Sequence, residues 1–330
     1  MASLISVTHL SSYLFCKRKL YLEQVLGLRA PPLEASIMGT IRHHVLDLVS
    51  KQEKGIVLSI VPENVAQIEE KYQSFYARNL ISTITIHAEL MTRQGLQENK
   101  VFDQLWLWFR EDAQMRARNL SQFIAKTNLF GRELWDNLSP KIHSELYVDS
   151  HLLELKGKID RVEERIIAEK GSKEQETSSG AHKTYIPVEI KTGRAPREGV
   201  WESHLIQIAA YILLLEEYFA CPVNEGKVQY LDALDARDSS TTAPETNDPL
   251  NHANLAATAS TVHLEERQGA PQTLRTVRMN PYLREEVIVL KEKVKWLLQS
   301  KELPNFVDNE NKCRKCPLQR ECWEMGGRKV

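Results

Sequence analysis

The sequence predicts an α/β fold in which helices flank a mixed β-sheet. Apolar residues recur at helical spacing as far as residue 137. From residue 141 the pattern changes to the apolar–polar alternation of strands, and an apolar helix at 202–219 separates two of them. Strands and helices that follow one another in this way are typical of a sheet covered by helices.

The first half of the chain is expected to be helical. Residues 6–26 predict one helix, and a second is expected from about Ser36, after a pair of prolines. Residues 62–137 are expected to be helical throughout. The aromatic run 102–109 is interpreted as packed core, because it lacks the basic and small residues that surround base-stacking aromatics.

Strands are expected in the second half. Their predicted ranges are 142–148, 152–162, 185–191, 227–231, 261–266 and 273–279, and an amphipathic helix follows at 281–300. Two polar segments, 170–184 and 234–260, are interpreted as loops. We therefore divide the chain into N-terminal helices (1–57), a helical insertion (58–140), an α/β core (141–280) and a C-terminal segment (281–330).

The charge of the chain gives no general indication of a ligand. The 330 residues carry a formal net charge of −1, so no basic surplus indicates nucleic acid. Basic residues gather at 17–19, at Arg194 and Arg197, and at 291–295, but each group alone is typical of a solvated helix face. Because no segment resembles a membrane span or a secretory signal, we expect a soluble, cytoplasmic protein.

The cysteines predict a metal centre. Cys313, Cys316 and Cys322 form a C-x2-C-x5-C cluster, a spacing that lets thiolates reach one centre. Cys16 is the expected fourth ligand and Cys221 the spare, so the cluster would join the two ends of the fold. Zinc sites usually consist of two paired half-sites; the second pair is missing here, which favours an iron–sulfur cluster over zinc. Free cysteines in a flexible tail are the remaining alternative, and disulfides are not expected.

A second group of residues lies in the predicted α/β core. Asp160 follows a Gly-Lys-Ile run in one predicted strand. Glu189 and Lys191 are two positions apart in the next strand, so they point to the same side while the residue between them packs into the core. Gln207 and Tyr211 are four apart and share one face of the predicted helix.

This group predicts a metal site. Two carboxylates a few ångströms apart repel unless a cation lies between them, so Asp160 and Glu189 predict a site for Mg2+ or Mn2+. Lys191 beside them would orient an attacking water and stabilise charge on a scissile phosphate, as metal-assisted phosphodiester hydrolysis requires. Surface salt bridges explain a Glu-x-Lys pattern taken alone, whereas its combination with the neighbouring carboxylate and the Gln-x3-Tyr pair favours the site.

These motifs resemble those of the RecB-like branch of the PD-(D/E)xK nucleases, and in particular the CRISPR-associated exonucleases with a four-cysteine iron–sulfur cluster. The resemblance covers the N-terminal helices, residues 141–233 and the C-terminal cysteines, and it implies a restriction-endonuclease-like fold. In that family a Gly-x3-His motif supplies a metal-ligating histidine. Gly39 and His43 match this motif, and the adjacent His44 falls outside it.

The resemblance also implies roles for the other site residues. Asp160 and Glu189 would be the metal-binding carboxylates, the carbonyl of Ile190 a further ligand, and Lys191 the catalytic lysine. Glu145 stands where the family often carries another acidic residue.

Further expectations concern the substrate and the cluster. Gln207 and Tyr211 match a Q-x3-Y element that positions the nucleic acid and the site. The ligands implied for a [4Fe-4S] cluster are Cys16, Cys313, Cys316 and Cys322. The helical insertion and the two polar loops depart from the family pattern.

The activity implied by the resemblance is that of a Mg2+- or Mn2+-dependent deoxyribonuclease. It would degrade single-stranded DNA ends as a 5′ to 3′ exonuclease and process DNA before integration into a CRISPR array, in antiviral defence. CRISPR integration proteins would be its partners, and no membrane would be involved. Two alternatives stay open: a DNA repair nuclease of the same fold that works with a helicase, and a non-catalytic iron–sulfur module that binds DNA ends.

Overall fold

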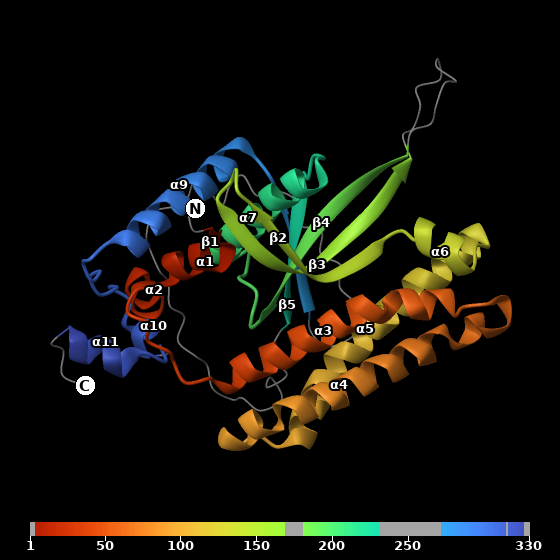
Figure 1. Cartoon of the computed structure of the whole chain (residues 1–330), viewed down its shortest axis with the longest axis horizontal. Helices are drawn as coiled ribbons and strands as arrows, with labels where there is room; N and C mark the ends of the chain where they lie inside the picture. Colours follow the sequence, from red (N-terminus) through yellow and green to blue (C-terminus); the bar gives the residue numbers. More distant parts are fainter. Residues whose placement is uncertain (1–3, 169–180, 232–271, 315, 327–330) are drawn as a thin grey trace, which may run out of the picture.

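A mixed sheet forms the centre of the molecule (Figure 1). The computed structural model describes residues 4–168, 181–231, 272–314 and 316–326. The strands in these residues are β1 (Ile5–Ser6), β2 (Lys141–Ser150), β3 (Leu155–Ala168), β4 (Ala181–Thr192), β5 (Glu225–Leu231) and β6 (Gln272–Arg278). The helices are α1 (Val7–Phe15), α2 (Lys17–Gln24), α3 (Glu34–Leu58), the 3-10 helix η1 (Pro62–Gln67), α4 (Ile68–Arg93), α5 (Glu98–Thr127), α6 (Gly131–Asn137), α7 (Glu202–Phe219), α9 (Pro281–Gln299), α10 (Glu310–Arg314) and α11 (Gln319–Met325).

The pairing of β3 explains where a site can form. The strand order is β1-β3-β4-β5-β6, and β2 pairs with the other edge of β3. β1 pairs with the first two residues of β3, and β4 pairs with it from Arg161 onward. The stretch 157–160 lies between these two pairings, and it carries Asp160. The sheet combines parallel and antiparallel pairs, which confirms the predicted mixed sheet.

Helices cover both faces of the sheet, as predicted (Figure 1). One apolar core lies between the sheet and helices α1, α7 and α9, and it includes the apolar middle of α7. A second core lies among α3, α4, α5 and α6, and Ile190 from β4 belongs to it. Trp108 and Phe109 of the aromatic run are buried in this second core, whereas Leu107 is 39% exposed, so the prediction of packed core holds for one side of this helix.

The prediction of one helix over residues 6–26 was wrong. Helices α1 and α2 are separated at Cys16, whose backbone is extended (φ −164°, ψ 109°). Its Sγ accepts a hydrogen bond of 3.3 Å from the amide of Lys19 and so caps the start of α2. The break therefore fixes the position of the cysteine that the sequence analysis assigns to the metal centre.

The predicted strands are present in the described residues, but several are longer than expected. The β3–β4 ladder continues as far as Ala168 paired with Ala181, because main-chain pairing extends past the apolar residues that signal a strand. The helical stretch 62–137 is divided by turns into η1, α4, α5 and α6. The predicted strand 261–266, the loop 234–260 and most of the loop 170–184 lie outside the described residues. No helix in the described part of the chain is both long and apolar enough to cross a bilayer.

Candidate active site and cysteine cavity

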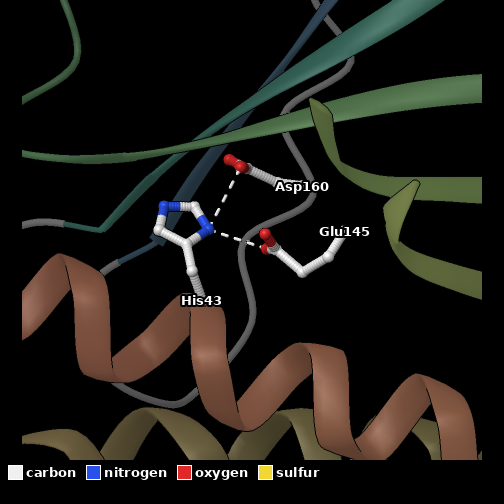
Figure 2. Close-up of side chains that lie close together, drawn as sticks. All are labelled: His43, Glu145 and Asp160. Atoms are coloured by element: carbon white, nitrogen blue, oxygen red, sulfur yellow. Dashed lines mark hydrogen bonds and ion pairs between the residues drawn. The ribbon is translucent and has the colours of Figure 1, made fainter. Parts of the chain in front are cut away.

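One imidazole and two carboxylates meet between α3 and the sheet, as Figure 2 shows. His43 Nδ1 lies 2.7 Å from Glu145 Oε1 and 3.4 Å from Asp160 Oδ1. One candidate ligand atom from each residue lies within 4.8 Å of the other two. Both carboxylates are buried, whereas 35% of the His43 side chain is exposed, so solvent reaches the group at the imidazole. Nitrogen and carboxylate oxygens are suitable ligands for a divalent ion.

The antiparallel pairing of β2 with β3 brings Glu145 opposite Asp160. The ladder is regular on both sides of this pair. At the pair itself Glu145 has a left-handed backbone conformation, with φ 57°. A residue with a side chain adopts this conformation only when its surroundings hold it there, and such strain is concentrated at functional sites.

Asp160 is oriented by the separation of β3 from β4. The ladder between these strands ends at Arg161 paired with Val188. Beyond that pair the Asp160 side chain accepts the main-chain hydrogen bond, since the amide of Ile190 donates to Asp160 Oδ2 over 2.7 Å. The bond occupies one carboxylate oxygen and leaves Oδ1 facing His43.

Gln207 on α7 forms hydrogen bonds with Glu189 and Lys191, the two predicted site residues of β4. Its Oε1 accepts from Lys191 Nζ at 2.8 Å, and its Nε2 donates to Glu189 Oε1 at 2.8 Å and to the Tyr211 hydroxyl at 3.2 Å. Lys191 Nζ also lies 2.8 Å from Glu189 Oε1. The second oxygen, Glu189 Oε2, is buried and has no hydrogen-bond partner among the described residues.

Helix α7 approaches β3 closely enough for a direct bond to its backbone. The Tyr211 hydroxyl donates to the carbonyl oxygen of Lys158 over 3.1 Å, and Ser11 Oγ donates to Gln207 Oε1 over 3.2 Å. A Cβ at Gly157 would lie only 2.6 Å from Tyr211 Cε1. Gly157 is therefore required for this approach of helix to strand.

Burial raises the pKa values of the two predicted carboxylates. Burial and the charge of Asp160 raise the pKa of Glu189 to about 7, although Lys191 opposes the shift. Burial also raises the pKa of Asp160 above its ordinary value, against the effects of His43 and the Ile190 amide. Burial lowers the pKa of His43, but the hydrogen bond to Glu145 and the charge of Asp160 outweigh it, so the net shift is upward. The group therefore binds protons more readily than isolated side chains do.

Two further cations lie near the carboxylates. Lys158 Nζ is 2.7 Å from Glu145 Oε2. Arg42, adjacent to His43, is buried, with its guanidinium carbon 5.9 Å from the centroid of the Trp108 ring. Burial lowers the pKa of Arg42, and the charges of the site carboxylates oppose that shift.

The structure brings the residues singled out from the sequence into one region. These are His43, Asp160, Glu189, Ile190, Lys191, Gln207 and Tyr211. Glu189 is bonded to Lys191 and Gln207, and it is not a member of the compact group of His43, Glu145 and Asp160. Glu145 was not among the predicted metal ligands, because its position depends on the register of β2 against β3. His44 instead packs edge to face against the ring of His87.

The other predicted centre is a cavity whose lining includes Cys16, Cys313, Cys316 and Cys322. Cys16 comes from the junction of α1 and α2, and the other three come from the C-terminal segment. No three of these sulfurs lie within 4.8 Å of one another in the part of the chain that the structure describes. Cys221 packs against the core that contains α7.

Comparison with known proteins gives the family. Over 202 residues, 58% of this chain, the sequence is 26% identical to "CRISPR-associated exonuclease Cas4/endonuclease Cas1 fusion" from Leptospira interrogans serogroup Icterohaemorrhagiae serovar Lai (strain 56601). The match spans 27% of that relative's length. A solved structure described as "Crystal structure of SSO0001" aligns with 83% of this chain and 94% of its own, at 12% identity and a TM-score of 0.25, which does not establish a shared fold.

A family model supplies the stronger result, because it matches residues 4–323 and so spans both the candidate active site and the cysteine cavity. The chain belongs to the PD-(D/E)XK nuclease superfamily.

Proposed function

We propose that this nuclease is a DNA exonuclease that uses Mg2+ or Mn2+ to hydrolyse single-stranded ends in the 5′ to 3′ direction. The observation that carries the proposal is the buried group of His43, Glu145 and Asp160, next to the bonded pair of Glu189 and Lys191. Buried carboxylates this close repel each other, which favours a cation between them, and the superfamily acts on phosphodiester bonds.

The residues present fit a divalent ion. Glu189 Oε2 is buried without a hydrogen-bond partner among the described residues, an arrangement that a cation would satisfy. His43, Asp160 and Glu189, with the carbonyl oxygen of Ile190, are the proposed ligands, and Glu145 is a further one. When bound, such an ion polarises a phosphoryl oxygen and lowers the pKa of a coordinated water.

Lys191 is the proposed catalytic residue. Its ammonium is held by Glu189 Oε1 and Gln207 Oε1 at 2.8 Å each, and about a quarter of its side chain is exposed. A cation fixed at the edge of a buried site can orient a water molecule and stabilise the charge that develops on a phosphate. Gln207 and Tyr211 keep that ammonium in place.

We further propose that the four cysteines hold a [4Fe-4S] cluster. They line one cavity, and no three of their sulfurs lie within 4.8 Å of one another among the described residues. A single zinc ion with bonds of about 2.3 Å would draw four sulfurs closer together, whereas a polynuclear cluster separates them. The cluster would join the α1–α2 junction to the C-terminal segment.

The cellular role is proposed from the relative alone. Its description combines an exonuclease with an endonuclease in a CRISPR-associated protein. We therefore propose that this chain processes DNA ends for CRISPR spacer acquisition, and that integration proteins are its partners.

A cleavage assay tests the activity. Anaerobically purified protein is incubated with 5′-labelled or 3′-labelled single strands, and with blunt duplex, in Mg2+, Mn2+ or EDTA. Progressive shortening of the 3′-labelled single strand, lost in EDTA, in Glu189→Gln and in Lys191→Met, is the expected result.

Glu164→Gln is the matched control. Like Glu145, Glu164 pairs with a histidine: His143 Nε2 on β2 lies 2.8 Å from Glu164 Oε2 on β3. Glu164 itself lies outside the candidate site. Glu164→Gln is expected to retain cleavage. Metal-dependent DNA binding without cleavage by the wild-type protein would favour the non-catalytic alternative, and undiminished cleavage by Glu189→Gln would contradict the proposed site.

A further inference from the structure

A buried arginine contacts the cysteine cavity directly. Arg18 on α2 is 5% exposed, and its Nε donates to Cys322 Sγ over 3.2 Å. The guanidinium also donates to the carbonyl oxygens of Pro304, at 2.7 Å, and Cys322, at 3.2 Å. Its carbon lies 4.1 Å from the centroid of the Phe306 ring. The side chain is therefore held in one orientation, with one N–H directed at a sulfur.

The charge of Arg18 has no acidic counterpart among the described residues, since the guanidinium contacts two carbonyl oxygens, a sulfur and an aromatic ring. A buried guanidinium requires a negative partner to offset its desolvation. A cluster bound by four thiolates carries a net negative charge, and one of its ligands is the sulfur that Arg18 contacts.

The surrounding chain packs closely around this arginine. A Cβ at Gly326 would lie 2.1 Å from Phe306 Cζ and 2.9 Å from Arg18 Nη2. Because Gly326 has no side chain, the backbone at position 326 can pack this closely against the Phe306 ring and the Arg18 guanidinium. Water is excluded from the arginine, which strengthens its electrostatic effect on the neighbouring sulfur.

We propose that Arg18 is a positioning residue for the cluster, which holds the Cys322 thiolate and stabilises the cluster after it accepts one electron from an external reductant. This inference rests on the cluster proposed above. Hydrogen bonds to ligand sulfurs and nearby positive charge favour the more negative, reduced form, so they raise the reduction potential. The amide of Lys19, which donates to Cys16 Sγ, supplies a second such bond from the backbone.

The test measures the reduction potential by anaerobic dithionite titration of the full chain, followed by visible absorption and EPR. Arg18→Gln is expected to disfavour reduction by about tenfold, which corresponds to about 59 mV for one electron. Lys312→Met is the matched control: Lys312 lines the same cavity, but its ammonium lies 5.7 Å from the Phe15 ring centroid. The control is expected to shift the potential much less. An equal shift in both variants, or none in Arg18→Gln with full iron content, would overturn the proposal.

A measurement on the unmutated protein covers the case in which Arg18→Gln fails to assemble the cluster. Pulsed EPR of reduced protein labelled with 15N-arginine is expected to reveal a nitrogen coupled to the cluster, and Arg18→Lys is expected to lose that signal. A wild-type spectrum without arginine coupling would overturn the inference. Wild-type protein without iron or visible absorption would instead contradict the proposed cluster itself, so the two failures are distinguishable.

Discussion

Glu145 and Asp160 stand opposite each other on β2 and β3, and their carboxylates converge on one nitrogen of His43. The register of the two strands creates this relationship, and the left-handed backbone of Glu145 accompanies it. The imidazole of His43 on helix α3 therefore completes a site whose two carboxylates come from opposite positions on β2 and β3.

The first prediction is that Glu145 contributes to metal binding. Glu145→Gln keeps the shape of the side chain but removes its charge, so Mn2+ affinity is expected to fall by at least about 10-fold. Mn2+ titration followed by EPR measures this. The Glu164→Gln control removes the carboxylate from the analogous pair with His143 and is expected to leave the affinity unchanged. Equal affinities of wild type and Glu145→Gln would exclude Glu145 as a ligand.

The second prediction concerns pH. The pKa of Glu189 is raised to about 7 in the folded protein, so the metal-free native state binds a proton that the unfolded chain has released. The contribution of Glu189 to the stability of the metal-free protein is therefore fully present below the ordinary glutamate pKa and is lost as pH rises from about 4.5 to about 7. Metal binding needs the ionised carboxylate, so affinity is expected to rise over the same range.

Urea unfolding at several pH values, with EDTA and with Mg2+, checks the sign of this effect. Glu189→Gln cannot titrate at this position, so it is expected to flatten the pH dependence in EDTA. A metal-free wild-type protein that gains stability between pH 5 and pH 7, relative to Glu189→Gln, would contradict the assignment of the raised pKa.

Local sequence patterns were sufficient to predict much of this architecture. Helix α7 was predicted with its observed bounds, because its middle is so rich in apolar residues that positions 206–215 are all buried. The alternation in β4 correctly predicted that Ile190 and Glu189 point to opposite sides of the strand. Ile190 packs into the core formed by the helices, and Glu189 accepts a hydrogen bond from Gln207. These features depend on residues close together in the chain.

Features that depend on distant contacts were not predictable in the same way. The break at Cys16 interrupts a helical pattern, and its sulfur, rather than a typical capping residue, accepts the Lys19 amide. The role of Glu145 requires the β2–β3 register, and no local signal specifies that register. A buried network around Arg116 was also missed, because charged residues on a predicted helix are expected to face solvent.

The third prediction concerns that network, which connects the helical layer to the strands of the site. Arg116 on α5 is 1% exposed; it donates to Ser144 Oγ at 2.9 Å and to Asp112 Oδ2 at 3.2 Å, and it is also paired with Glu53. Asp112 in turn binds Arg161. Ser144 and Arg161 adjoin Glu145 and Asp160 in sequence, so the network supports the strand positions from which both site carboxylates project.

Arg116→Met is expected to destabilise the protein by about 3–5 kcal/mol, since it leaves the buried carboxylate of Glu53 without its cation and removes one of the two arginines that pair with Asp112. Chemical denaturation measures the change in the free energy of unfolding. Arg132→Ala is the control, because Arg132 is 86% exposed and lies 3.5 Å from Asp136, and its loss is expected to cost about 0–1 kcal/mol. Similar costs for the two variants would mean that the buried network adds no stability.

The fourth prediction concerns Gly157 and Tyr211. Alanine at position 157 would bring its Cβ within 2.6 Å of Tyr211 Cε1, so the ring must move away from β3. That movement would break the bond from the Tyr211 hydroxyl to the Lys158 carbonyl and disturb Gln207, which holds Lys191. Gly157→Ala is expected to cost about 1–3 kcal/mol of stability and to reduce kcat.

A double-mutant cycle with Tyr211→Ala separates this contact from an effect of the backbone. If the steric contact is the cause, Gly157→Ala costs less in the Tyr211→Ala background than in the wild type, because the ring is no longer there. The difference is expected to be about 0.5–3 kcal/mol, measured by urea unfolding. Strictly additive costs would mean that Gly157 is needed for its own backbone and not for the approach of α7. Because Tyr211 also bonds to Gln207, the cycle connects the packing of one glycine to the position of Lys191, the proposed catalytic lysine.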